Sequence, residues 1–189
     1  VNERGEPAGY IDTSIQLSDK YRPWYSSRFA NIEEVADYWM KNYNTLKEKT
    51  ELFTDAFYAT TLPAEVVEAV AANLTILKSP TIFRQYDGRM WNWEGCGNEY
   101  GSCYGSCTHV WNYAQAIPHL FPKMERTLRE TEFFVSQAKN GHQAFRSALP
   151  IRPIRHNFHA AADGQLGGIM KVYRDWHIYG NDEWLKLIY

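Results

Sequence analysis

The sequence of 189 residues has few cysteines, little net charge and no long apolar run. Its three cysteines are Cys96, Cys103 and Cys107. An odd number of thiols cannot pair completely within one chain, so a disulfide-stabilised scaffold is not expected. The 20 basic and 22 acidic residues leave a net charge of -2, which excludes a nucleic-acid binder that relies on bulk positive charge. No run approaches the roughly 18 apolar residues that a membrane-spanning helix needs.

Both ends of the sequence look like cut ends rather than natural termini. The first residues contain no charged segment followed by an apolar one, as a signal peptide would, and no initiator methionine. The last residues, from Trp184 to Tyr189, are apolar and are not followed by a polar tail. We therefore expect a piece of a larger protein. Its compartment stays open, and the missing signal and the odd cysteine count favour the cytoplasm.

What the sequence does have is helical periodicity in a composition typical of a folded domain, with 44% hydrophobic and 15% aromatic residues. Apolar residues at three- and four-residue steps predict a long helix over 32–57 that Asn31 caps. Pro63 suits the first turn of a second helix. The apolar positions of this second helix predict a buried stripe formed by Val66, Val67, Val70, Leu74 and Leu77.

Two further helical stretches follow in the second half of the chain. The first runs from about Thr108 to Lys139, with a kink or break near Pro118 and Pro122. The second begins near Asp163, which we expect as its cap, and ends at Gly180-Asn181, where Asp182 caps a last helix. The apolar positions of the stretch from 163 are Leu166, Ile169, Met170, Tyr173 and Trp176. The charged residues expected on a solvated face of the earlier stretch are Glu125, Arg126, Arg129, Glu130 and Glu132.

Strand signals are weak, at 81–84 and before Tyr25, so the expected class is all-α, built from helical hairpins. Two long irregular stretches, 79–107 and 140–162, interrupt the helices. Such long loops are uncommon in a compact domain unless they carry function. We therefore expect the functional residues in these loops, on one side of the helices.

The first loop places aromatic rings around a carboxylate. Trp91 and Trp93 precede Glu94 in a glycine-rich segment that also contains Glu99. Indole faces suit the C–H face of a sugar ring, and paired carboxylates supply the nucleophile and the acid of glycoside cleavage. The alternative is structural: Glu94 caps a turn or pairs with an arginine, and the tryptophans simply pack.

The same loop contains a candidate zinc set of three thiols and an imidazole, namely Cys96, Cys103, Cys107 and His109. The spacing departs from the tight cysteine pairs of zinc knuckles. Packing of small buried thiols is therefore favoured, and no metal or other cofactor is expected.

The second loop offers groups that hydrogen-bond to hydroxyls. They include His156, His159 and Asp163, which also resemble a set of metal ligands. No second motif supports a metal there, and Asp163 is favoured as a plain helix cap.

Taken together, these segments resemble the catalytic region of glycoside hydrolase family 116, which includes bacterial β-glucosidases and non-lysosomal glucosylceramidases. The resemblance covers most of the chain. It rests on Asp87-Gly88-Arg89, Trp93-Glu94-Gly95, Asn98-Glu99-Tyr100, the segments 107–115 and 120–126, Asp163-Gly164-Gln165-Leu166, the segment 172–176 and Gly180-Asn181-Asp182. Upstream, Tyr25–Phe29 and Leu62-Pro63 also fit.

The resemblance implies a fold and a domain organisation. Residues 25–189 would form the N-terminal part of an (α/α)6 toroid, and residues 1–24 would connect it to a preceding β-rich domain. With only the first helices of a closed ring, apolar faces would be exposed, so we expect poor solubility of this piece alone.

The resemblance also implies a retaining mechanism with Glu94 as the nucleophile. The aspartate that serves the family as acid/base would lie beyond Tyr189. An aspartate and a histidine of the family bind glucose hydroxyls, but here the matching region reads Cys107-Thr108-His109. The aspartate's role would therefore be unfilled or taken by Thr108, and a preference for glucose does not follow from the resemblance. A second sugar-binding histidine maps to His156, with His159 as the other choice. Glu99 would orient Glu94 or bind a hydroxyl.

Two functions from other classes remain as alternatives to a glycosidase. One is a non-catalytic carbohydrate-binding helical module that keeps the shape of the pocket. The other is a zinc-stabilised helical interaction domain that uses the cysteine loop. In the preferred interpretation the partner is a carbohydrate or glycoside substrate.

Overall fold

The computed structural model describes residues 22–78, 82–92, 106–108, 116–148, 151–153 and 159–189. Over these residues the protein is mostly helical with a small two-stranded sheet, which agrees with the expected all-α class. Short 3-10 segments span Trp24–Ser27 and Thr75–Lys78, and a π-helical segment spans Thr131–Ser136. The main elements are α1 (Ile32–Tyr58), α2 (Ala64–Leu74), β1 (Ile82–Arg84), β2 (Met90–Asn92), α3 (Ala116–Leu120), α4 (Pro122–Glu130), α5 (Ala162–Tyr179) and α6 (Asp182–Ile188).

The long first helix is confirmed, and so is its cap. The Asn31 side chain accepts a hydrogen bond from the Glu34 amide at 2.9 Å, and the Glu34 carboxylate accepts one from the Ala30 amide at 2.8 Å. The first bond satisfies a backbone donor that the first turn of a helix leaves unpaired, and the second fixes the residue before the cap to the same turn. Pro63 directly precedes α2 as its N-cap residue.

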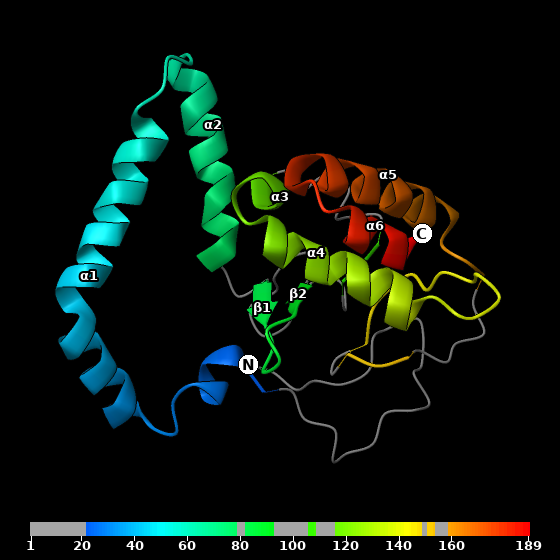
Figure 1. Ribbon diagram of the computed structural model, residues 1–189, viewed down its shortest axis with the longest axis horizontal. Helices are drawn as coiled ribbons and strands as arrows, with labels where there is room; N and C mark the ends of the chain where they lie inside the picture. The colour runs from blue at the N-terminus through cyan, green and yellow to red at the C-terminus, as the bar shows by residue number, and fades with distance from the viewer. Residues whose placement is uncertain (1–21, 79–81, 93–105, 109–115, 149–150, 154–158) are drawn as a thin grey trace.

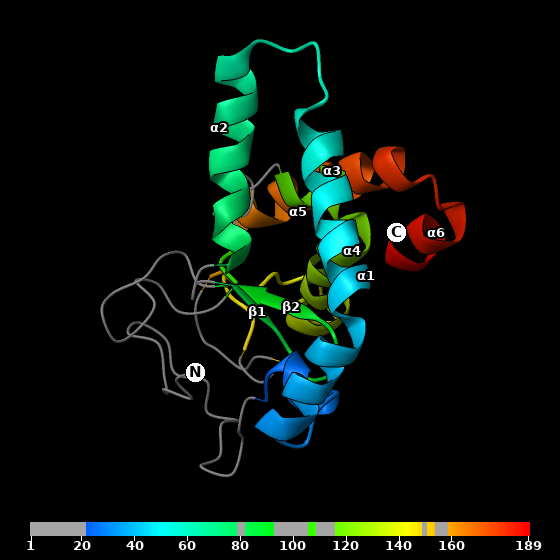
Figure 2. The same ribbon diagram turned by 90° about the vertical axis from the view of Figure 1, so that its left-hand side faces the viewer.

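Helices α1 and α2 form a hairpin whose tip points away from the other helices (Figures 1 and 2). No described side chain of either helix is buried. The predicted buried stripe of α2 is therefore wrong at Val66 and Val70, which are 45% and 39% exposed. Its apolar face stands outside the body of the molecule, and only Leu77, after the helix, packs against the core.

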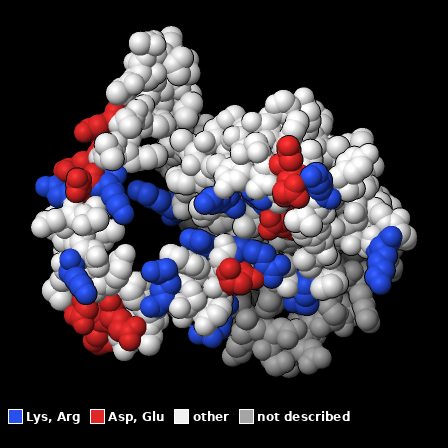
Figure 3. Space-filling model, in the orientation of Figure 1, with Lys and Arg blue, Asp and Glu red and all other residues white. Residues whose placement is uncertain are grey.

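The upper part of this hairpin shows mostly uncharged surface in Figure 3. Exposed apolar side chains there include Leu52, Phe53, Tyr58 and Leu62. An apolar patch of this kind usually marks an interaction surface or a tendency to aggregate. Poor solubility of residues 1–189 alone stays a prediction.

The β1–β2 hairpin lies below α4 in Figure 1. Strand β1 is the one predicted over 81–84, whereas β2 was not predicted. The two strands are antiparallel, with Phe83 opposite Trp91. Gly88, at φ +94°, closes the turn between them, a backbone conformation that favours glycine. An isolated bridge between Pro23 and Gln85 places the chain before Tyr25 beside this hairpin.

Helix α3, helix α4 and the π-helical segment lie within the stretch 108–139, for which a helix with a kink or break near Pro118 and Pro122 was predicted. The helix is interrupted at Phe121. Pro122 begins α4 at a position where the amide hydrogen that proline lacks would have no helical partner. Thr108 lies in a turn rather than in a helix. The apolar core of the described residues lies where these helices meet the hairpin, and it consists of Met90, Ile117 and Leu128, with Leu77, Ile82, Phe121 and Met124 against them.

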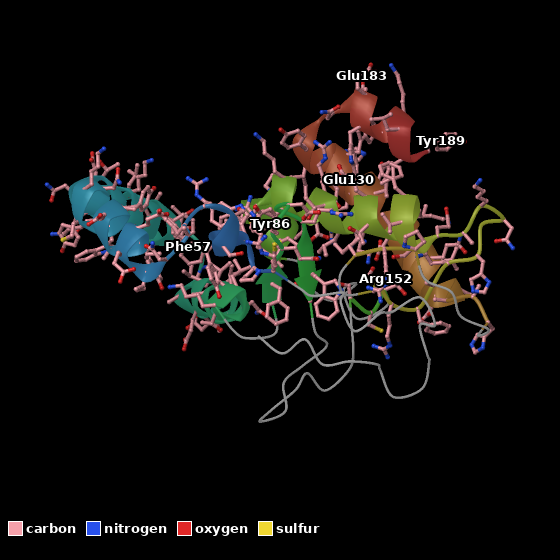
Figure 4. All side chains as sticks on the ribbon, turned by 90° about the horizontal axis from the view of Figure 1, so that it is seen from below. Phe57, Tyr86, Glu130, Arg152, Glu183 and Tyr189 are labelled. Carbon is pink, nitrogen blue, oxygen red and sulfur yellow. The ribbon has the colours of Figure 1, made fainter. Side chains whose placement is uncertain are left out.

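Helix α5 ends as predicted, because Gly180 takes the left-handed conformation at φ +66°. The cap of α6 is Asn181 and not Asp182, as the Asn181 side chain accepts from the Trp184 amide at 2.9 Å. Asp182 instead accepts from the Trp176 indole at 2.7 Å and so joins the two helices. Figure 4 shows Glu130 on α4 near α6, where its carboxylate accepts from the Trp184 indole at 3.1 Å.

Candidate functional site

The two irregular stretches contact each other beside the β-hairpin. Trp91 of the first stretch donates from its indole to the Ala148 carbonyl at 3.1 Å, and the Thr108 amide donates to the Phe145 carbonyl at 3.0 Å. The second stretch also reaches the start of α5, because the Ala161 amide donates to the Gln143 carbonyl at 3.0 Å. The structure thus brings together the two loops in which the functional residues were predicted.

The end of β2 is clamped to the segment 106–108. The Asn92 amide donates to the Ser106 hydroxyl at 3.0 Å, and both residues are buried. Cys107 and Thr108, which follow, are also buried. Asn92 and Ser106, the described residues on either side of the stretch 93–105, are therefore neighbours and are both buried.

Trp91 is fully buried, at 0% exposure, and its ring packs against Phe83 with the centroids 5.9 Å apart. Of the two roles considered from the sequence, packing is the one that the described residues show. With its indole nitrogen hydrogen-bonded and its ring enclosed, Trp91 fixes the end of the hairpin to the second loop. A contact between Trp91 and a sugar stays a prediction.

Thr108 is wedged between the second loop and α5. Its amide donates to Phe145, and its carbonyl accepts from the Lys171 ammonium group at 3.2 Å. A Cβ added to Gly164 would lie 1.9 Å from the Thr108 hydroxyl oxygen, so the glycine is what lets α5 approach this closely. Among the described residues, the Thr108 hydroxyl has no hydrogen-bond partner.

Asn92, at the other end of the clamp, also has buried side-chain atoms without a hydrogen-bond partner among the described residues. Its side chain is 0% exposed, yet neither the amide oxygen nor the amide nitrogen has a partner among the described residues. Buried polar groups are almost always paired, so unpaired ones call for an explanation such as a ligand or a water molecule. Asn92 and Thr108 are two such groups on connected segments.

His159 and Asp163 lie on the second loop and at the start of α5. His159 is exposed, and its ring meets Phe145 edge-on with the centroids 5.2 Å apart. Asp163 is also exposed and is not the cap, which corrects the sequence prediction: α5 begins at Ala162, and its N-cap residue is Ala161. The carboxylate instead lies in the first turn, where it interacts favourably with the helix dipole.

The other predicted site residues lie outside the described residues: Glu94, Trp93, Glu99, His109 and His156. Cys96 and Cys103 lie outside them as well, so the zinc set of the cysteine loop is represented only by the buried Cys107. Within the described ranges, no three histidine, cysteine or acidic side chains gather in a way that could hold a metal ion.

A buried ionic network between α4, the π-helical segment and α5 was not predicted. Glu125 and Arg129 were expected on a solvated face of α4, but each is 1% exposed, and Glu132 is 5% exposed. The prediction is wrong because the charged face of α4 packs against a second charged face, on α5. On α5, Arg174 pairs with Glu125 of α4, Lys171 pairs with Glu132 of the π-helical segment, and Asp175 pairs with Arg174 on the same helix.

The network forms a continuous chain of opposite charges. Lys171 lies 3.4 Å from Glu132, which lies 2.8 Å from Arg129. Arg129 is 3.7 Å from Glu125, and this carboxylate is 2.8 Å from Arg174. Arg174 in turn pairs with Asp175 at 2.8 Å. Three cations and three carboxylates thus compensate one another, as buried charges must.

Burial shifts the protonation equilibria within this network. Desolvation raises the pKa of Glu125 above its ordinary value, against the opposing effect of Arg129. It also raises the pKa of Asp175, against the effect of Arg174. The pKa of Lys171 falls to about 8, chiefly through desolvation and then through repulsion from Arg129.

Gly164, Gly168, Lys171 and Asp175 form the buried face of α5. Their spacing of four, three and four residues is a signal that the sequence carries. Apolar residues on the other faces of α5 are exposed, among them Leu166, Met170 and Tyr173. The glycines allow close packing, since a Cβ on Gly168 would lie 3.1 Å from the Phe133 ring.

Comparisons with known proteins add no family to this description: no protein-family model and no curated protein matches the sequence. None of the described helices is both long enough and apolar enough to cross a membrane.

Proposed function

We propose that the protein is a retaining glycoside hydrolase that cleaves β-glucosides or related β-glycosides, with Glu94 as its nucleophile. The proposal includes the wider fold, in which the helices described above belong to an (α/α)6 toroid. It rests first on the resemblance of the Trp93-Glu94-Gly95 and Asn98-Glu99-Tyr100 segments to glycoside hydrolase family 116.

The observation that carries the proposal is the meeting of the two loops at the end of β2. Glu94 comes two residues after the buried Asn92, whose amide is clamped to Ser106. A nucleophile must be held on a rigid support to attack a single carbon atom. A strand end fixed from two sides supplies such a support.

The unpaired polar groups next to this support have the hydrogen-bonding chemistry to bind hydroxyls, although both are enclosed by protein, Asn92 at 0% and Thr108 at 1% exposure. The Asn92 amide can donate and accept, and the Thr108 hydroxyl can do both as well. In the proposed site Thr108 and His109 bind sugar hydroxyls, and His156 or His159 contributes from the second loop. Trp93 offers its ring to the sugar, Trp91 supports the hairpin beneath it, and Glu99 orients Glu94 or binds a hydroxyl.

In the proposed reaction Glu94 attacks the anomeric carbon and the aglycone oxygen leaves with a proton from a second carboxylic acid. Water then displaces Glu94 from the same face that the aglycone left, with the second group acting as base. Two inversions give net retention, and this mechanism needs the two carboxyl groups roughly 5–5.5 Å apart.

The stereochemistry of the product tests the proposal. We expect the intact protein to hydrolyse 4-nitrophenyl β-glucoside and to release β-glucose first, seen by proton NMR before mutarotation produces the α-anomer. First release of α-glucose would exclude a retaining mechanism. Binding of aryl β-glycosides without hydrolysis would instead favour the non-catalytic carbohydrate-binding module.

A further inference from the structure

Lys171 connects the ionic network to the segment that ends the first loop. Its side chain is buried, at 4% exposure, and its ammonium group lies 3.2 Å from the Thr108 carbonyl and 3.4 Å from the Glu132 carboxylate. The first of these contacts joins residues 63 positions apart in the chain. It is therefore a tertiary contact between α5 and the buried segment 106–108.

We propose that Lys171 is a positioning residue, which holds Thr108 and with it the re-entry point of the loop through a charge-assisted hydrogen bond to the Thr108 carbonyl. A hydrogen bond from an ionised donor is roughly twice as strong as one between neutral groups. Loss of the proton from Lys171 weakens this anchor. The anchor itself follows from the contacts above, whereas its consequence for catalysis rests on the proposed function.

The charged groups around Lys171 explain why a lysine can be buried at this position and why its charge depends on pH near pH 8. From α4 it faces Glu125 and Arg129, and from the π-helical segment it faces Glu132. On its own helix Asp175 also interacts with it. The segment 106–108 contributes the Thr108 carbonyl as an acceptor.

Global stability and the local anchor are expected to respond to pH in opposite directions. Because the folded-state pKa of Lys171 is lowered from 10.5 to about 8, the stabilisation from this group is complete above its unfolded pKa and is lost as the pH falls through about 8. Raising the pH from 7 to 9.5 therefore increases the contribution of Lys171 to folding stability. The same change removes the charge from the bond to Thr108.

The hydrogen-exchange rate of the Thr108 amide measures how firmly Lys171 holds this segment, and the measurement does not depend on enzymatic activity. This amide donates to Phe145 at 3.0 Å, so it is protected only while the segment stays in place. In the intact protein at pH 7, we expect Lys171→Met to lower its protection factor by about tenfold or more. Lys171→Arg, which keeps the charge and the donors, should retain most of the protection. Lys186→Met, at an exposed lysine paired with Glu183, is the matched control.

The pH dependence provides a second readout that does not require a variant to fold. After correction for intrinsic exchange rates, protection of Thr108 in the wild type should fall between pH 7 and 9.5, and protection in Lys171→Arg should not. Unchanged protection in Lys171→Met, or no fall with pH in the wild type, would overturn the proposal. So would an equal loss at core amides such as that of Met90, because a purely structural lysine would act on the whole fold. Failure of the proposed glycosidase activity would leave these exchange results unaffected.

Discussion

The Glu94→Gln variant is expected to lose hydrolysis of aryl β-glucosides by about four orders of magnitude or more. A glutamine has nearly the same shape as glutamate, but its amide cannot form the glycosyl ester. Removal of a nucleophile from a covalent mechanism has effects of this size in other enzymes. The measurement is kcat with 2,4-dinitrophenyl β-glucoside, whose leaving group departs without a general acid.

Two comparisons make this result specific to the nucleophile. Glu99→Gln should keep measurable turnover, because Glu99 is assigned to orientation or to hydroxyl binding. Azide should rescue Glu94→Gly and give α-glucosyl azide, since it attacks from the face that the carboxylate occupied. A Glu94→Gln protein with near wild-type turnover would refute the assignment, and loss of activity confined to Glu99→Gln would transfer it to that residue.

Loss of Arg129 is expected to give the largest effect on stability. Its guanidinium group is 1% exposed and lies 2.8 Å from Glu132 and 3.7 Å from Glu125. In Arg129→Met these two carboxylates stay buried with only part of their compensation. Breaking a buried ion pair in this way costs about 3–5 kcal/mol in the free energy of unfolding. Urea denaturation at pH 7 measures this loss.

The surface pair of Lys47 and Glu51 supplies the matched control. Both side chains are more than half exposed, so Lys47→Met should change the free energy of unfolding by less than about 1 kcal/mol.

The pH dependence of the loss of stability in Arg129→Met provides a further check. The folded-state pKa of Glu125 is raised, so its contribution to stability is present at low pH and is lost as the pH rises through that pKa. Arg129 lowers this pKa, so its loss in Arg129→Met raises the pKa of Glu125 further, and protonation of Glu125 should make the deficit smaller at pH 5 than at pH 7. A deficit below about 1 kcal/mol at pH 7 would contradict a supporting role for the network.

Local signals in the sequence predicted the helices and several of their ends. Asn31 before an apolar-periodic run and Gly180 after another both mark helix boundaries that the structure confirms. These features depend on backbone chemistry within a few residues, which a single sequence contains. The same local chemistry gave wrong caps at Asp163 and Asp182. Asp182 stands one position after Asn181, the actual cap of α6, and Asp163 stands two positions after Ala161, the N-cap residue of α5.

The faces of the helices could not be predicted in the same way. Glu125 and Arg129 are four residues apart, as surface ion pairs often are, and nothing local tells that their face is covered. The cover comes from Lys171 and Arg174, about 45 residues further along the chain. Conversely, the apolar stripe of α2 was expected to be buried, yet Val66 and Val70 are exposed.

The sequence also predicted that function would concentrate in the two irregular stretches. Trp91 and Ala148, and Thr108 and Phe145, join the two stretches in the structure, while the location of function in them stays a prediction. The hydrogen bond between Asn92 and Ser106 could not be predicted from the sequence. It depends on β2, and a strand of three residues is too short to leave a recognisable sequence pattern. The roles of Glu94, Glu99 and the histidines stay predictions.

Covalent trapping tests the central claim most directly. The probe is 2,4-dinitrophenyl 2-deoxy-2-fluoro-β-glucoside, applied to the intact protein, because fluorine slows release of the glycosyl-enzyme while the leaving group still departs. We predict a stable adduct of one fluoroglucosyl group per chain, located by peptide mass spectrometry on Glu94. An adduct on Glu99 or on another carboxylate, or hydrolysis of β-glucosides without any adduct, would contradict Glu94 as the nucleophile.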